Sequence, residues 1–162
     1  CESAAASFGK AALRDVSIEE FERRSWEMPE IERRRARHII YENKRVLDAV
    51  ETLRSGDIVA FARLIGASHE SLRDDFQISC RELDVMVEAA RRQPEVLAAR
   101  MTGGGFGGCA IALLEDDASS DITDHIAAEY KTETGIEPEF YECRIMGGVR
   151  EIKERRRDIS EI

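Results

Sequence analysis

The chain has 162 residues, of which 43% are hydrophobic and 35% are charged, and its formal net charge is −9. A chain of this length can bury one core, and its charge content excludes a membrane segment. The negative charge repels a phosphate backbone, so we expect neither nucleic acid nor a membrane as a partner. The arginine clusters at 33–35 and 155–157 are interleaved with or followed by acidic residues, which predicts solvated helix faces.

Four cysteines, Cys1, Cys80, Cys109 and Cys143, lie far apart and form no C-x-x-C pair. Without a signal peptide, and with apolar neighbours around Cys109 and Cys143, they are expected to be buried thiols rather than a zinc site or a disulfide framework. This predicts a reducing, cytoplasmic setting. Because the first residue is Cys1 and a helical pattern begins at once, we expect the chain to be part of a longer polypeptide.

The first half of the chain has helical periodicity. Ser17 and Glu20 have capping-box spacing, and Val16 is placed to pack on Phe21, which predicts a short helix to about Ser25. A long helix after Pro29 should end at Gly56, with these residues on its apolar stripe: Ala36, Ile39, Ile40, Val46, Leu47, Val50 and Leu53.

Two further helices are predicted before the middle of the chain. Asp57 can cap the first of them. Its buried face is expected to hold Ile58, Phe61, Ala62, Ile65 and Leu72. Ser79 and Glu82 repeat the capping box and open the second, which carries apolar residues as far as the break at Pro94.

From residue 96 the pattern changes to short apolar runs. The segments 96–101 and 109–114 are too short for helices between their flanking breakers, so both are predicted strands. A helix over 120–134 should bury Ile122, Ile126, Ala127 and Tyr130 and end at Gly135. The segment 139–145 alternates, which predicts a third strand with Tyr141, Cys143 and Ile145 on one face.

This order of elements predicts an α+β fold, in which helices pack on one face of an open sheet. A ferredoxin-like sandwich needs a fourth strand, which would come from residues 13–16 or from sequence outside the chain.

Five of the eleven glycines fall between the two predicted strands, at Gly103, Gly104, Gly105, Gly107 and Gly108. Glycine admits positive φ and leaves no Cβ in the way, so successive backbone amides can turn inward and cradle a phosphate. Thr102 adds a hydroxyl donor at the rim. A hairpin loop that binds nothing needs only one or two glycines, so we favour a ligand-binding loop.

The loop differs from two common phosphate-binding motifs. No G-x-x-x-x-G-K-[ST] pattern is present, and no lysine follows to reach a phosphate. The letters from Gly103 to Gly108 match G-x-G-x-x-G, but an apolar strand-like run follows rather than a helix, so a dinucleotide site is excluded.

Residues 100–109 closely resemble the third conserved motif of the GHMP family of small-molecule kinases, in the version with Phe106 and Cys109 that looks like galactokinases. Two further blocks match the family in order and spacing. They are residues 68–76 running on into 79–84, and residues 35–38 with Glu42 and Asn43. The resemblance extends from Cys1 to about Ile145.

The resemblance implies the carboxyl-terminal domain of a two-domain enzyme, of ferredoxin-like type with added N-terminal helices. Such an enzyme transfers the γ-phosphoryl group of ATP to the anomeric hydroxyl of galactose with Mg²⁺, in a cleft between its domains. The domain would span 1–145 and a charged tail 146–162. In the family, the catalytic arginine and aspartate and the serine-rich phosphate loop belong to the first domain, so no catalytic residue and no metal ligand is assigned here. The residues implied to enclose phosphates and sugar are Thr102, Gly103, Gly104, Gly105, Phe106, Gly107 and Gly108.

Some residues depart from the family pattern. Gly104 stands where alanine is common, Arg81 where proline is usual, and the tail 146–162 fits poorly. Two alternatives stay open. One is a free-standing α+β module that binds a small anion, and the other is a GHMP kinase that acts on a different alcohol.

The remaining polar residues are expected to be structural. His69, with the acidic residues around it, fits a structural or domain-interface role better than a catalytic one. His38 should be packed and hydrogen-bonded, and Asn43 should be a buried amide that needs partners.

Overall fold

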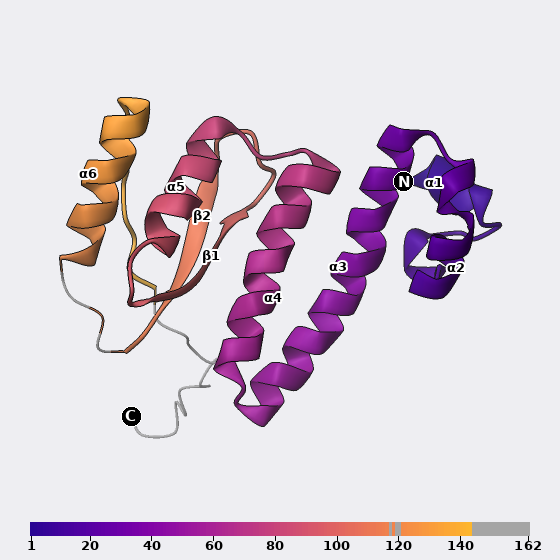
Figure 1. The fold of residues 1–162 in the computed structure, drawn as a ribbon, viewed down its shortest axis with the longest axis horizontal. Coiled ribbons are helices and arrows are strands. Elements are labelled where there is room, and N and C mark those ends of the chain that lie inside the picture. Colours follow the sequence, from indigo (N-terminus) through magenta and orange to yellow (C-terminus); the bar gives the residue numbers. More distant parts are fainter. Residues whose placement is uncertain (117, 119–120, 144–162) are drawn as a thin grey trace, which may run out of the picture.

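The structure, a computed structural model, describes residues 1–116, 118 and 121–143. Its helices and strands are α1 (Glu2–Ser7), α2 (Ile18–Arg24), α3 (Glu30–Ser55), α4 (Ile58–Ser71), α5 (Arg81–Arg91), β1 (Val96–Thr102), β2 (Cys109–Leu114) and α6 (Ile122–Thr134). Short 3₁₀ turns lie at Leu13–Asp15 and Ser25–Glu27, and a π-helical turn at Leu72–Phe76 extends α4. In Figure 1 these elements form a row, from α6 and α5 beside the two strands, through α4 and α3, to α1 and α2.

Several predicted helix ends are confirmed. The Ser17 side chain accepts a hydrogen bond from the Glu20 amide at the start of α2, and Asp57 accepts one from the Ala60 amide at the start of α4. Gly56 and Gly135 end α3 and α6 in the left-handed conformation, at φ 73° and φ 74°. These ends follow local chemistry, because side-chain oxygens satisfy amides that lack a partner at a helix start and glycine tolerates positive φ.

The start of α5 lies one residue later than the capping box predicts. Cys80 is the N-cap and makes no side-chain cap hydrogen bond. Instead, the Ser79 hydroxyl donates to Asp84 Oδ1 at 2.5 Å. This hydrogen bond connects the segment that precedes α5 to the first turn of that helix.

The two central strands are confirmed as an antiparallel pair, in register from Ala98 opposite Leu113 to Thr102 opposite Cys109. With helices α4 and α5 against β1, the α+β class is also confirmed. The predicted third strand is wrong over 139–143, which forms no strand, and 144–145 lie outside the described residues. Tyr141 is 79% exposed, because an alternating segment without a partner strand has no sheet to join.

The proposed fourth strand at 13–16 is also wrong, since Leu13–Asp15 forms a 3₁₀ turn. Leu13 and Val16 are nevertheless buried, against the helices around α3. The described residues therefore supply two of the four strands of a ferredoxin-like sandwich, and that detail is not confirmed.

The buried side chains form three clusters. The first joins α1 and α2 to α3 and contains the predicted staple pair Val16 and Phe21. The second lies between α5, α6 and the strands, where Ile122 and Ile126 are buried as predicted. The third is small and consists of Leu72, Leu83 and Met101, with Phe76, Ile78 and Cys80 packed against it. Because Met101 immediately precedes the glycine loop, this third cluster fixes the base of that loop.

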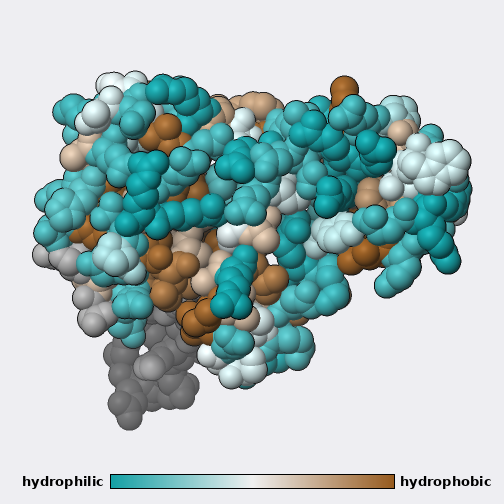
Figure 2. Space-filling view, in the orientation of Figure 1, coloured by the Kyte–Doolittle hydropathy of each residue, from teal (hydrophilic) through white to brown (hydrophobic). Residues whose placement is uncertain are grey.

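The apolar stripe of α3 is buried only in part. Ala36 and Ile40 are buried, but the second half of the stripe is exposed, at Val46, Leu47, Val50 and Leu53. Ile58 and Val59 at the start of α4 are exposed as well. Hydrophobic side chains accordingly show at the surface near the turn between α3 and α4 (Figure 2). The helical spacing of the apolar residues predicted which side of α3 is apolar. It did not predict how much of that side other elements cover.

The prediction of buried cysteines is wrong. Cys1, Cys109 and Cys143 are exposed and Cys80 is intermediate, and all four are free. Cys109 and Cys143 have apolar neighbours in sequence, but nothing in the described part of the chain packs over them. Among the described helices, none is long and apolar enough to cross a membrane.

Candidate functional site: the glycine loop and its base

The glycine loop connects β1 to β2. Thr102 pairs with Cys109 at the root of the hairpin, so residues 103–108 form the connection itself. Gly103, Gly105 and Gly107 have φ values of 79°, 80° and 106°. Residues other than glycine adopt such φ values only under strain, which explains why this connection is so rich in glycine.

Phe106 is the exception within the loop. It adopts φ 57° although it is not glycine, and its side chain is 74% exposed. A large apolar side chain held outward in a strained conformation is unusual at a free surface. This residue is therefore the member of the loop best placed to contact something outside the described chain.

The tip of the loop is fastened to the segment that precedes α5. The Phe106 amide donates to the Ile78 carbonyl at 2.9 Å. A Cβ on Gly105 would lie only 2.1 Å from that same oxygen, so the two backbones approach as closely as glycine permits. Within the described residues, Phe106 is the one member of 103–108 whose amide has an acceptor, which leaves the glycine amides available to a ligand.

His69 holds the root of the loop. Its ring is 1% exposed, and its Nδ1 accepts a hydrogen bond from the Met101 amide at 3.3 Å. The proton of the neutral ring must then be on Nε2, which lies 3.7 Å from Asp84 Oδ1 and has no hydrogen-bond partner among the described residues. Burial lowers the pKa of His69, so the neutral form that accepts this bond is favoured. This geometry indicates a structural role for His69.

A charged network ties the same strand to α3 and α4. Arg100 donates to the Ser68 hydroxyl at 2.8 Å, and Ser68 donates to Glu42 Oε1. Arg45 Nε donates to Glu42 Oε2 at 2.6 Å. Burial alone would raise the pKa of Glu42, but the hydrogen bonds from Ser68 and Arg45 outweigh it, and the pKa is lowered. Glu42 therefore stays ionised and links three elements below the loop.

His38 is packed and hydrogen-bonded, as predicted. Its Nδ1 lies 3.0 Å from the Ser71 hydroxyl, which itself donates to Asp75 Oδ2 at 3.0 Å. The ring also lies 4.9 Å from the ring of Phe76. Asn43, in contrast, is exposed, so the prediction of a buried amide at that position is wrong.

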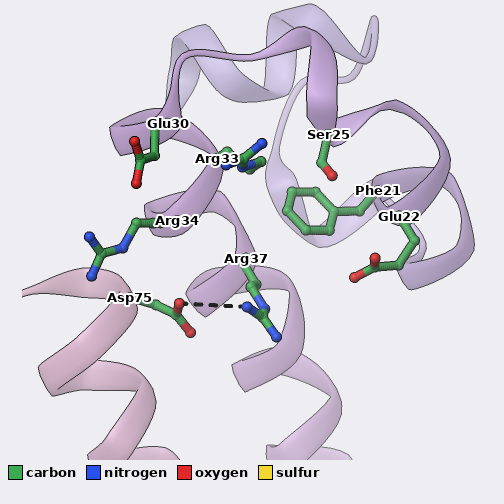
Figure 3. Close-up of a pocket in the computed structure, with 8 residues that line it drawn as sticks. All are labelled: Phe21, Glu22, Ser25, Glu30, Arg33, Arg34, Arg37 and Asp75. Carbon is green, nitrogen blue, oxygen red and sulfur yellow. Dashed lines mark ion pairs between the residues drawn. The ribbon is translucent and has the colours of Figure 1, made fainter.

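An open cavity of about 460 Å³ lies between α2, the start of α3 and the π-helical turn (Figure 3). Arg33 and Arg34 are half-buried in its wall, so only part of the cluster 33–35 is a solvated face; the cluster at 155–157 lies outside the described residues. Arg37 forms an ion pair with Asp75 at 4.0 Å across the cavity. Guanidinium and carboxylate groups are equal in number among the lining residues, which are Phe21, Glu22, Ser25, Glu30, Arg33, Arg34, Arg37 and Asp75. Because the charges balance and no loop residue contributes, we assign no ligand to this cavity.

The three blocks of sequence singled out above therefore meet in space. His38 and Glu42 contact Ser71 and Ser68 of the second block. Ser68, His69 and Ile78 in turn contact Arg100, Met101 and Phe106 of the third. Sequence reasoning missed Gln77 and the Ile78 carbonyl, because a backbone acceptor leaves no trace in the identity of its residue.

Comparison with known proteins places the chain in a family. The family described as GHMP kinases C terminal matches residues 49–132, which is more than half of the chain. The chain belongs to the GHMP kinase family. The matched GHMP segment includes α4, the π-helical turn, α5, both strands and the glycine loop.

Relatives of this GHMP kinase chain extend the match towards both ends. The galactokinase of Haemophilus influenzae (strain Rd) is 46% identical over 94% of this chain, and that of Exiguobacterium sibiricum is 46% identical over 89%. The crystal structure of Lactococcus lactis galactokinase complexed with galactose superimposes with a TM-score of 0.77 at 40% identity, over 80% of this chain and 34% of that one. The chain spans about 41% of the length of the Haemophilus relative.

Proposed function

We propose that this chain is the carboxyl-terminal part of a galactokinase. The complete enzyme would transfer the γ-phosphoryl group of ATP to the anomeric hydroxyl of galactose. Support comes from galactokinases that are 46% identical to the chain, and from the similarity to a galactokinase that was crystallised with galactose. The domain boundaries of the proposal are 1–145, followed by a tail at 146–162.

The backbone geometry of the loop gives the proposal its main structural support. Its glycine amides have no acceptor within the described chain, and its exposed residues leave room for a ligand to approach. Backbone amides aimed at a phosphate stabilise negative charge without any reactive side chain. We propose that Thr102, Gly103, Gly104, Gly105, Phe106, Gly107 and Gly108 enclose the phosphates of ATP and the sugar.

In this proposal the loop positions the reactants and the reacting groups come from elsewhere in the full-length protein. Phosphoryl transfer depends chiefly on alignment and on stabilisation of charge, so one domain can contribute a loop of donors alone. We assign no catalytic side chain to this chain, and we expect the chain by itself to be inactive.

Mg²⁺ commonly accompanies ATP, held by the phosphates and one or two carboxylates. Across residues 1–116, 118 and 121–143, no group of three or more His, Cys, Asp or Glu side chains has the arrangement of a metal site. In this proposal the ligands of the ion are the phosphates and the remainder of the enzyme.

A cytoplasmic location and the absence of nucleic-acid and membrane partners belong to the same proposal. The net charge of −9 disfavours both anionic surfaces, and four free thiols suit a reducing compartment.

An ATP-consumption assay tests the proposal. The full-length protein that contains this chain is supplied with ATP and, in parallel, galactose, N-acetylgalactosamine and other hexoses or pentoses. We expect consumption with galactose. Consumption with a different alcohol alone would indicate another GHMP kinase. No consumption with any of them, together with binding of a small anion, would indicate a binding module and contradict the proposal.

A further inference from the structure

The segment that follows the π-helical turn touches the glycine loop at its tip. Leu72–Phe76 ends in Gln77, which adopts the left-handed conformation at φ 62° and ψ 48°. This reverses the chain, and the Ile78 amide then donates to the Leu72 carbonyl at 3.2 Å. The Ile78 carbonyl is left facing the loop, where it accepts the hydrogen bond from Phe106.

The conformation of Gln77 is the point on which this arrangement depends. Gln77 is exposed, and no hydrogen bond or ion pair of its side chain occurs among the described residues. The left-handed conformation is strained for a residue other than glycine, by an amount that corresponds to roughly 5- to 30-fold in an equilibrium constant. Such a conformation persists only where the surrounding contacts hold it.

The same segment is joined to the root of the loop through side chains. Ser79 donates to Asp84, and Asp84 faces the buried Nε2 of His69. His69 in turn accepts from the amide of Met101, immediately before Thr102. The loop is therefore held at its first residues and at its tip by one set of contacts, which runs from His69 through Asp84 and Ser79 to Ile78.

We infer that Gln77 is a positioning residue for the kinase reaction. Its left-handed turn aims the Ile78 carbonyl at Phe106 and so sets the distance between the glycine amides and the phosphates of ATP. The inference rests on the proposed function and deepens it, because it assigns a task to the block 68–84 that lies behind the loop. Misplacement of reacting groups by about 1 Å can slow an enzyme by roughly 100-fold. A small shift of the Ile78 carbonyl, which fixes the loop, should therefore slow the reaction.

A pair of substitutions isolates the backbone effect. Gln77→Gly and Gln77→Val both remove the same exposed side chain, but glycine accepts positive φ whereas a β-branched residue resists it. In the full-length enzyme we expect Gln77→Val to raise KM for ATP about fivefold or more, as a strain of this size allows. We expect Gln77→Gly to stay within about twofold of the wild type.

Gln93→Val provides the control, because Gln93 lies beyond α5 and away from the loop. Simple loss of folded protein lowers kcat and leaves KM unchanged, so the rise in KM separates positioning from stability. Thermal melting of each variant verifies that it is folded.

Amide hydrogen exchange gives a second readout that needs no activity. With fragmentation that resolves single residues, the amide of Phe106 should exchange slowly in the wild-type protein and rapidly in Gln77→Val. A slow Phe106 amide in folded Gln77→Val, or equal KM values for the valine and glycine variants, would overturn the inference. A wild-type protein that consumes no ATP with any sugar would overturn the proposed function instead, and the exchange measurement would still decide whether Gln77 holds the loop.

Discussion

Replacement of Gly105 by alanine is the sharpest perturbation of the loop that the structure suggests. The added Cβ would lie 2.1 Å from the Ile78 oxygen and 3.0 Å from the Ile78 carbonyl carbon. Real Cβ atoms essentially never come within 3.0 Å of a heavy atom to which they are not bonded. The obstacle is backbone, which cannot rotate away as a side chain can. The loop or the segment at Ile78 must therefore retreat by close to 1 Å.

Two further costs accompany that movement. Alanine at φ 80° is strained by roughly 1–2 kcal/mol, and loss of the hydrogen bond from Phe106 to Ile78 costs about 1 kcal/mol. A displacement of about 1 Å at the phosphates predicts a fall in kcat/KM of roughly 100-fold. The measurement is the steady-state kinetics of ATP consumption with galactose by the full-length variant.

Gly104→Ala is the matched control. Its Cβ would have nothing within 4 Å and its φ is not positive, so we expect activity within about twofold of the wild type. If folded Gly105→Ala turned over as fast as Gly104→Ala, the described contact between the loop and Ile78 would not be what positions the phosphates.

Gly107→Val, at φ 106°, should abolish turnover and lower the melting temperature by only roughly a few degrees, because the strain is about 1–2 kcal/mol and is confined to the loop; near-normal turnover would count against a ligand-facing loop. Ser17→Ala should lower the free energy of unfolding by about 1 kcal/mol in chemical denaturation, since the Glu20 amide loses its cap, and an unchanged midpoint would argue against that cap. Burial lowers the pKa of both His38 and His69, so the unfolded chain binds more protons below pH 6.5, the ordinary histidine value; stability should be constant above that pH and fall as the pH drops through it. Thermal melts from about pH 7.5 to 5 test this, and His69→Asn, which keeps an acceptor for Met101, should flatten the slope; an identical slope would refute the assignment to His69.

The sequence was most informative where structure depends on neighbouring residues. The caps at Ser17 and Asp57 and the glycine ends of α3 and α6 were predicted correctly, because each depends on a few adjacent side chains. The two strands were also correct, since Val96 to Thr102 and Cys109 to Leu114 leave no room for helices.

Features that depend on distant partners were predicted less well. Alternation at 139–143 resembles a strand, but sheet pairing needs a neighbour that the described residues do not supply. Leu47 and Leu53 have helical spacing with Ile40, yet they are exposed because no described residue packs over their side of α3. An apolar side chain gains stability from burial, but its residue type does not show whether another element packs over it. Burial can be assigned only when that neighbour is known.

The candidate site divides in the same way. The glycine loop was identifiable because its chemistry resides in residue type, as the φ values of Gly103 and Gly105 illustrate. Its attachment was not, because the Ile78 carbonyl and the left-handed Gln77 are backbone features. The sequence favoured a structural or domain-interface role for His69, but it did not indicate that the ring accepts a hydrogen bond from the Met101 amide.

Deuterium uptake of the loop with and without nucleotide tests the central claim most directly. The full-length protein is compared alone, with galactose, and with galactose plus a non-hydrolysable ATP analogue. If the glycine amides bind phosphate, exchange of the peptide covering residues 102–109 should slow when the analogue is added. Unchanged uptake there, in a protein that phosphorylates galactose, would mean that the phosphates are bound elsewhere.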